Sequence, residues 1–146
     1  MPAQMKMEQN TKQSQLVPGL NGVKVLVVDD DADTREYIAF LLEQYEANVK
    51  VVVSAQEALE ALTQFQPDIL LSDIGMSNMD GYMLMRQVRN LPPELGGQIP
   101  AIALTAYAGE INYQQALSSG FQKHLSKPVE PAELIAAIAS LTRNLE

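Results

Sequence analysis

Five short runs of apolar, mostly β-branched residues alternate along the chain with longer segments in which apolar residues recur every three or four positions. The short runs are VKVLVV (23–28), VKVVV (49–53), DILLSD (68–73), IPAIALTA (99–106) and FQKHLSKP (121–128). Runs of this length and composition predict β-strands. Because several are apolar at consecutive rather than alternating positions, we expect strands buried on both faces, as in a parallel sheet covered by helices on each side.

The longer segments predict helices. Their apolar spacing favours helices over residues 32–45, 54–65, 81–90, 109–120 and 130–144. Ser54 and Glu57 form a capping box at the start of the second helix, and Asp31 or Asp33 is the candidate N-cap of the first. Strands and helices therefore alternate in five β/α units, which indicates an α/β fold.

The length of the chain fits one compact domain. It has 146 residues, of which 47% are hydrophobic. Residues 1–20 are polar, rich in glutamine and without periodicity. We therefore expect a flexible tail or linker over residues 1–20 and a single folded domain over residues 21–146.

Composition excludes several classes of function. The chain has no cysteine, so neither a disulfide framework nor a thiolate metal site can form. No apolar run reaches the roughly 18–20 residues that cross a bilayer, and the N-terminus has no signal-peptide pattern; we expect a cytoplasmic protein without membrane contact. The net charge of −8 argues against nucleic-acid binding, because phosphate contacts depend on Lys and Arg.

Polar side chains stand where the predicted strands end. Right-handed crossovers bring the carboxyl ends of parallel strands to one edge of the sheet, where ligands of such folds bind. The residues at these ends are Asp29, Asp30, Asp31, Asp73, Thr105 and Lys127. Any one aspartate at a strand end is most simply a helix cap. Polar residues at four strand ends together favour a site, and clustered carboxylates favour a hard cation such as Mg²⁺.

Four segments together resemble the receiver domains of two-component response regulators of the chemotaxis-regulator type. They are VLVVDDDADTRE, PDILLSDIGMSNMDG, IPAIALTA and KHLSKPVEP, and the resemblance extends from Val23 to Leu141. It implies a doubly wound, five-stranded parallel sheet in the flavodoxin-like order 2-1-3-4-5, a (βα)5 fold.

The resemblance also implies roles for the clustered residues. Asp73 would accept a phosphoryl group from a phosphohistidine and form an acyl phosphate. Asp30 would bind Mg²⁺ directly with help from Asp29 and Asp73, and the backbone carbonyl of Gly75 would be a further ligand. Lys127 would pair with a phosphoryl oxygen, and the peptide bond between Lys127 and Pro128 would be cis. The hydroxyl of Thr105 would move toward the phosphoryl group as part of the switch.

In such a relay the partner is a histidine kinase or a histidine phosphotransfer domain. Phosphorylation would change the binding of a downstream protein to the surface formed by the fourth helix, the fifth strand and the last helix. No output domain is expected after Leu141, so we expect signalling through protein contacts, by a stand-alone regulator or by the receiver module of a hybrid sensor kinase. The domain would catalyse its own phosphorylation and hydrolysis without turning over an external substrate.

The sequence departs from the usual receiver pattern at four positions. Ser77 replaces a proline in the loop after Asp73. His124 stands where receivers carry the Tyr or Phe that moves together with the threonine, and two interpretations stay open: a surface histidine with weakened coupling, or a working switch residue. Gly75 and Tyr107 occupy the two positions that tune access of water to the phosphoryl group, with a net effect that the sequence does not reveal.

Four other functions fit less well. A haloacid-dehalogenase-like phosphohydrolase would need Thr or Val where Asp33 stands and a late acidic pair, but no aspartate follows Asp80. An EF-hand is excluded by Thr34 and Phe40 at its Gly and Glu positions. Three aspartates would repel the phosphate of a flavin. A receiver that is never phosphorylated and serves only for docking stays open, although every acceptor-site residue is intact.

Overall fold

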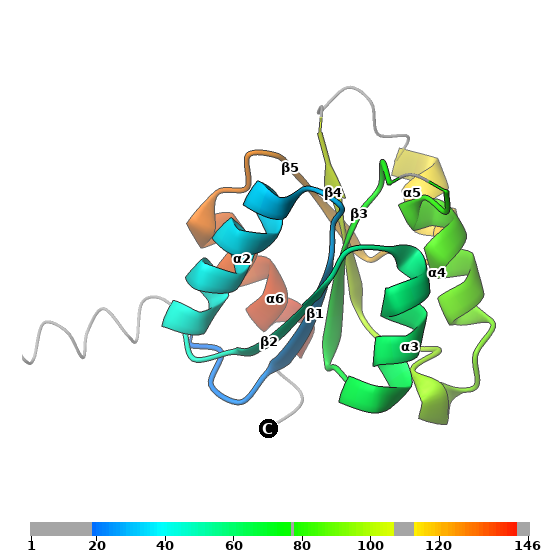
Figure 1. Cartoon of the computed structure of the whole chain (residues 1–146), viewed down its shortest axis with the longest axis horizontal. Coiled ribbons are helices and arrows are strands. Elements are labelled where there is room, and N and C mark those ends of the chain that lie inside the picture. Colours follow the sequence, from blue (N-terminus) through cyan, green and yellow to red (C-terminus); the bar gives the residue numbers. More distant parts are fainter. Residues whose placement is uncertain (1–18, 77, 107–112, 143–146) are drawn as a thin grey trace, which may run out of the picture.

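The structure, a computed structural model of the chain, describes residues 19–76, 78–106 and 113–142 (Figure 1). The predicted alternation of strands and helices is confirmed for this part of the chain. The strands are β1 (Lys24–Val28), β2 (Asn48–Val52), β3 (Ile69–Asp73), β4 (Ala101–Thr105) and β5 (Lys123–Ser126). The helices are α2 (Ala32–Gln44), α3 (Ala55–Phe65), α4 (Gly81–Arg89), α5 (Tyr113–Ser119) and α6 (Pro131–Thr142).

The five strands form one parallel sheet in the order β2-β1-β3-β4-β5. The chain moves from β1 outward to β2, returns to β3 on the other side of β1, and then continues to β4 and β5. The predicted order is therefore confirmed. This reversal beside β1 makes the carboxyl ends of β1 and β3 the place where the crossing loops diverge and leave room for a site.

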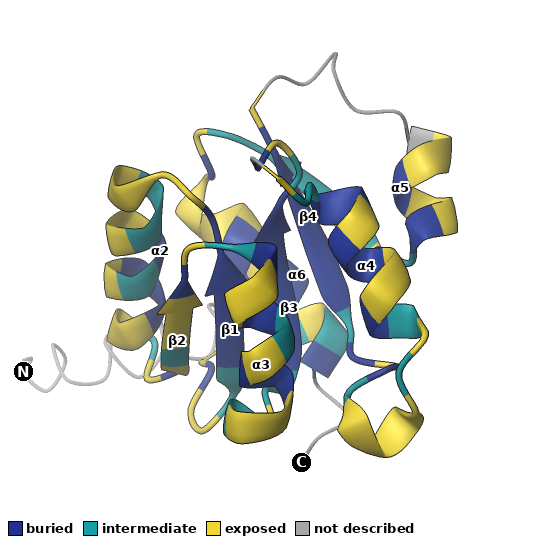
Figure 2. Cartoon of the chain, turned by 45° about the vertical axis from the view of Figure 1, so that its right-hand side comes forward, coloured by how far each residue is buried: buried dark blue, intermediate teal, exposed yellow. Residues whose placement is uncertain are grey.

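Helices cover both faces of the sheet. Helices α2 and α6 lie on one face, and α3, α4 and α5 lie on the other (Figure 1). Each layer encloses its own hydrophobic core: Val25, Val27 and Leu71 face the first, and Leu26, Leu70 and Ala103 face the second. Strands β3 and β4 are buried along their whole length, as is β1 after Lys24 (Figure 2). The prediction of burial on both faces holds for these three central strands.

That prediction is wrong for the two edge strands. β2 is largely exposed, with Val52 as its one buried residue, and β5 is only partly buried throughout. An edge strand is paired on one side alone, and the helix layers do not extend fully over it. Val51 is therefore exposed despite its apolar side chain. Lys50, exposed in the middle of β2, is the type of residue that discourages pairing with another chain at a free edge.

Local capping fixes where the helices begin. The Asp31 carboxylate accepts hydrogen bonds from the Thr34 amide (3.1 Å) and hydroxyl (2.6 Å), so Asp31, and not Asp33, is the N-cap of α2. In α3 the Glu57 amide donates to Ser54 Oγ (3.2 Å). The Glu57 carboxylate reaches back to the amide of Val53 (3.0 Å), one residue earlier than in the standard capping box.

A few features differ from the predicted boundaries or lie outside the described residues. A 3-10 turn over Pro93–Leu95, between α4 and β4, was not predicted. Leu20, inside the segment predicted as a tail, is buried. Ser77 and Tyr107 lie outside the described residues, as do 1–18, 109–112 and 143–144. In the described part of the chain, no helix combines the length and hydropathy needed to cross a membrane.

Gly81 lets α4 begin directly against the end of β3. Its amide donates to the carbonyl of Ile74 (2.9 Å). A Cβ atom at this position would lie 2.5 Å from the carbonyl oxygen of Asp73 and 3.0 Å from Cα of Ile74. Both neighbours are backbone atoms that have little freedom to move, so the close approach requires glycine.

We predict that Gly81→Ala destabilises the protein, although alanine is the better helix former by about 1 kcal/mol. The clash with the β3 backbone should outweigh that gain and lower the free energy of unfolding by roughly 1–3 kcal/mol. Urea denaturation followed by circular dichroism measures the change. Gly75→Ala is the matched control, since its Cβ would meet nothing within 4 Å; equal stability of both variants would contradict the prediction.

Candidate functional site

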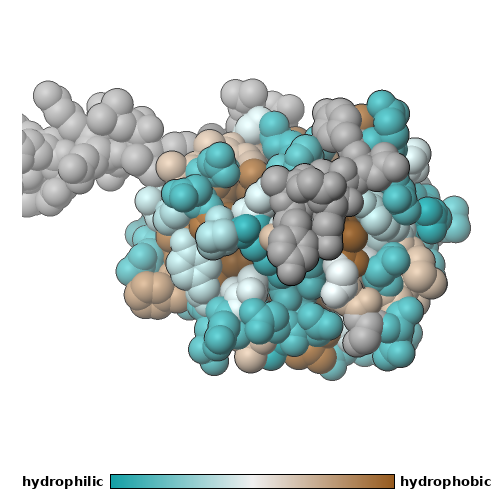
Figure 3. Space-filling model, turned by 90° about the horizontal axis from the view of Figure 1, so that it is seen from above, coloured by the Kyte–Doolittle hydropathy of each residue, from teal (hydrophilic) through white to brown (hydrophobic). Residues whose placement is uncertain are grey.

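The polar residues predicted to converge do meet at the carboxyl edge of the sheet. Asp29 follows β1, Asp73 ends β3, Thr105 ends β4 and Lys127 follows β5. Seen from above this edge, hydrophilic residues predominate on the surface (Figure 3). Backbone bonds join the strand ends: the Asp29 amide donates to Val52 O (3.3 Å), and the Lys127 amide to Thr105 O (2.7 Å).

The three consecutive aspartates occupy three different environments. Asp29 is completely buried, and its Oδ2 lies 2.8 Å from Nζ of Lys127. Asp30 is exposed and lines the cleft above the sheet. Asp31 is committed to capping α2, and its hydrogen bonds with Thr34 lower the pKa of its carboxyl. Two of the three carboxylates therefore remain for a site, and the third stabilises the helix that follows them.

Asp73 is buried at the end of β3. Its Oδ1 lies 3.3 Å from Nζ of Lys127 and accepts a hydrogen bond from the amide of Gly75 (3.3 Å). Burial raises the pKa of the Asp73 carboxyl, and the charge of Asp29 raises it further; Lys127 and the Gly75 amide counteract only part of this. Among the described residues, no hydrogen bond or ion pair engages Oδ2 of Asp73, which leaves one carboxylate oxygen available.

Lys127 is the positive charge of the site. Burial by itself would lower the pKa of its ammonium group, but hydrogen bonding and attraction from Asp29 and Asp73 outweigh burial and raise it. The lysine therefore stays charged and holds two carboxylates at once. The peptide bond between Lys127 and Pro128 is cis, as the resemblance implied.

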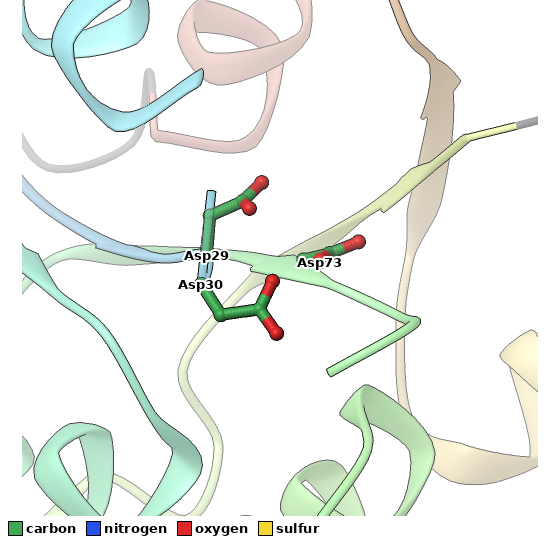
Figure 4. Close-up of side chains that lie close together, drawn as sticks. All are labelled: Asp29, Asp30 and Asp73. Carbon is green, nitrogen blue, oxygen red and sulfur yellow. The ribbon is translucent and has the colours of Figure 1, made fainter. Parts of the chain in front are cut away.

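The acidic cluster fits a divalent cation. One carboxylate oxygen from each of Asp29, Asp30 and Asp73 lies within 4.8 Å of the others, and Figure 4 shows the three side chains around a common space. All three donors are hard oxygen ligands, which suit Mg²⁺. Gly75 is exposed in the loop after β3 and lines the same cleft. The resemblance implied these four residues as ligands, and that role stays a prediction.

A cleft of about 520 Å³ opens above the cluster. Thr105 lines it; this residue is buried, and its Oγ1 has no hydrogen-bond partner among the described residues. A buried hydroxyl without a partner is unusual and is available to donate to a group bound in the cleft. Tyr82 and Gln115 also line the cleft, and the sequence analysis missed both. Helical periodicity marks which residues face a core, but it does not reveal which of them border a cleft.

His124 lies on β5 opposite Ala103 of β4 and is partly buried. Thr105 pairs with Ser126, two residues further along β5. Residues two apart on a strand project to the same face, so Thr105 and His124 are diagonal neighbours on one face of the sheet. The position suits a switch residue, and the two interpretations of His124 remain open.

Comparison with known proteins gives one consistent result. Residues 25–139 match the family described as the response regulator receiver domain. The chain is 51% identical over 114 residues to the uncharacterized 14.6 kDa protein in the sodA1 3′ region of Leptolyngbya boryana, covering 78% of this chain and 86% of that protein. It is 34% identical to the phosphate regulon transcriptional regulatory protein PhoB of Pseudomonas aeruginosa, covering 84% of this chain but only 52% of PhoB.

A similar solved structure adds information on metal binding. The receiver domain of a sensor histidine kinase from Pseudomonas aeruginosa is 28% identical, with a TM-score of 0.76, and the match covers 84% of this chain and 98% of that domain. That structure has a magnesium ion coordinated in its active-site cleft. The two proteins therefore share the receiver fold.

Replacing Lys127 should test the charge balance of the site. In chelator-containing buffer, Lys127→Met leaves the buried Asp29 carboxylate without its counter-charge and should lower the free energy of unfolding by about 3 kcal/mol. Urea denaturation measures this loss, and adding Asp29→Asn should restore part of it. Lys123→Met, on the preceding strand β5, is the control. Equal losses for the two lysine variants would refute this account.

Asp73→Asn should change how the free energy of unfolding depends on pH, compared with the wild type. Because the pKa of Asp73 is raised in the folded state, the ionised carboxylate destabilises the fold above that pKa, and the penalty disappears below the unfolded value of about 3.9. Without metal, Asp73→Asn should therefore be more stable than the wild type at neutral pH, with an advantage that shrinks toward pH 4. Urea titrations across this range test it; a difference independent of pH would argue against it.

Proposed function

The chain belongs to the response regulator receiver domain family, and on that basis we propose that Asp73 is the phosphoacceptor of a two-component phosphorelay. One observation carries the proposal. The Asp73 carboxylate pairs with the ammonium of Lys127, forms part of an acidic cluster suited to a divalent cation, and lines an open cleft. A nucleophilic carboxylate flanked by positive charge is what phosphoryl transfer to an aspartate requires.

In the proposed reaction, an Asp73 carboxylate oxygen attacks the phosphorus of a phosphohistidine. The new O–P bond gives an acyl phosphate, while the N–P bond breaks and its electron pair returns to the imidazole nitrogen of the donor. Oδ1 of Asp73 is held by Lys127 and the Gly75 amide, so Oδ2 is the oxygen available for attack. No other co-reactant is needed, because the donor supplies the phosphoryl group.

Charge stabilisation around the transferred group comes from three sources. Lys127 would move from the Asp73 carboxylate to a phosphoryl oxygen as a point charge, and the unpartnered Thr105 hydroxyl would donate to another. Mg²⁺, held by Asp29, Asp30, Asp73 and the Gly75 carbonyl, would neutralise negative charge on the phosphoryl oxygens. Burial of Asp73 keeps these interactions in a region of low dielectric, where they are stronger than in water.

The effect of phosphorylation would reach the protein surface through β4 and β5. Thr105 and His124 project from one face of the sheet, the face that α5 covers, so a shift of the threonine toward the phosphoryl group would change the space available to the histidine. The surface formed by α5, β5 and α6 would then change its affinity for a downstream protein. We propose a histidine kinase or a histidine phosphotransfer domain as donor, with residues 21–146 as the receiver domain.

The chain spans about half the length of PhoB, and a receiver in a sensor histidine kinase is among its structural neighbours. Both arrangements, a regulator and a module of a hybrid kinase, are consistent with these similarities. The chemistry proposed for Asp73 is the same in either arrangement.

We predict that acetyl phosphate with Mg²⁺ adds the mass of one phosphoryl group to the wild-type protein. The adduct should be absent from Asp73→Asn and should not form with a chelator present, because the acidic cluster then lacks its cation. Intact-mass spectrometry measures it. Asp80→Asn is the control, since Asp80 caps α4 and lies outside the proposed site.

A folded wild type that gains no adduct from acetyl phosphate or from a phosphorylated histidine phosphotransfer domain would contradict the proposal. That result would favour the docking module. An adduct that persists in Asp73→Asn would reject Asp73 as the acceptor.

A further inference from the structure

Arg35 makes a contact with the acidic turn that the proposed reaction does not use. It lies on the first turns of α2, and its guanidinium Nη1 donates a hydrogen bond to the backbone carbonyl of Asp29 (2.8 Å). The residue is partly buried, and the bond spans six residues. Side chains on a helix tilt toward its N-terminus, which directs Arg35 back over the turn that joins β1 to α2.

The carbonyl that Arg35 binds belongs to the peptide group between Asp29 and Asp30. Fixing that carbonyl fixes the plane of the peptide and therefore the direction in which Asp30 leaves the turn. The other polar groups of Asp29 are also engaged: its amide donates to Val52 O (3.3 Å), and its Oδ1 accepts from the Asp31 amide (2.9 Å). With the bond from Arg35, the amide, the carbonyl and Oδ1 of Asp29 all have hydrogen-bond partners.

Asp30 depends on this external support. Its side chain is exposed, and among the described residues no hydrogen bond or ion pair holds its carboxylate. Its carboxylate nevertheless lies within 4.8 Å of those of Asp29 and Asp73 (Figure 4). The conformation of the backbone, and not a contact made by the side chain, therefore directs the Asp30 carboxylate toward those of Asp29 and Asp73.

We propose that Arg35 is a positioning residue for divalent-cation binding, which acts by holding the peptide group between Asp29 and Asp30. The proposal rests on the proposed function, because it assumes that the acidic cluster binds a cation. Partners that orient metal ligands without touching the metal commonly change affinity by roughly 10- to 100-fold when removed.

The direction in which the affinity for Mg²⁺ changes distinguishes a positioning role of Arg35 from a purely electrostatic one. Arg35 carries a positive charge beside a site for a cation, so removing the charge alone should strengthen binding of Mg²⁺. Removing a positioning bond should weaken it. A weaker affinity in a variant without the arginine is therefore a result that charge cannot produce.

Isothermal titration of the full chain with Mg²⁺ tests this inference. Arg35→Met keeps the length of the stem and removes both charge and donors; we expect its affinity for Mg²⁺ to fall about tenfold. Arg35→Lys keeps the charge without the planar fork and should lie between Arg35→Met and the wild type. Arg86→Met removes an exposed arginine of α4 and should retain the wild-type affinity.

A second readout uses phosphorylation by acetyl phosphate as a function of Mg²⁺ concentration. Arg35→Met should need about tenfold more Mg²⁺ for half-maximal rate and should reach the wild-type rate at saturation. A lower plateau with unchanged half-saturation would overturn the positioning role.

Failure of this inference can be told apart from failure of the proposed function. No Mg²⁺ binding by the folded wild type would overturn both. Mg²⁺ binding by the wild type with equal or tighter binding by Arg35→Met would overturn the role of Arg35 alone, as would equal weakening by Arg86→Met. Should Arg35→Met fail to fold, Arg35→Lys compared with Arg86→Lys decides the question, and equal affinities of those two variants would overturn the role.

Discussion

The ion pair between Lys127 and the buried Asp29 is the interaction on which the site depends. A carboxylate without solvent exposure needs a nearby positive charge, and Lys127 supplies one at 2.8 Å while also approaching Asp73 at 3.3 Å. One ammonium therefore stabilises carboxylates from two strands. The acidic cluster still carries more negative than positive charge, because Asp30 has no counter-charge of its own among the described residues. This excess of negative charge is what makes a cation site at the sheet edge physically reasonable.

The sheet provides a rigid base for this balance of charges. The central strands β1, β3 and β4 are buried on both faces, so the ends from which Asp29, Asp73 and Thr105 project have little freedom to move. Gly81 brings α4 against the end of β3, and the Asp31 cap starts α2 directly after the acidic turn. The less buried β5 carries His124 and leads to Lys127. The strands that hold Asp73, the proposed acceptor, are thus packed firmly, while the strand proposed to transmit its state is packed more loosely.

Each of the three consecutive aspartates has its own physical task. Asp29 is buried and paired with lysine, Asp30 is exposed and aimed by the backbone, and Asp31 caps a helix. Lys127 offsets the charge of Asp29, and hydrogen bonds from Thr34 stabilise the Asp31 carboxylate, which leaves Asp30 as the one of the three without a partner among the described residues. Arg35 joins this arrangement through a backbone carbonyl, so it contributes to the geometry of the turn without competing for the carboxylates.

The sequence by itself determined the five β/α units, the Ser54 cap and the meeting of Asp29, Asp73, Thr105 and Lys127 at one edge, and it left the cap of α2 open between Asp31 and Asp33. These follow from local periodicity, from short-range hydrogen bonding and from the rule that parallel strands end on the same side; the strand order came from resemblance. Tertiary structure alone decided the exposure of β2, the lining of the cleft by Tyr82 and Gln115, and the bond from Arg35 to Asp29. The first two depend on which elements lie side by side across the sheet, because a residue carries no local mark of a neighbour that is distant in sequence. The Arg35 bond spans only six residues, but it depends on how the turn between β1 and α2 folds, which helical periodicity does not reveal.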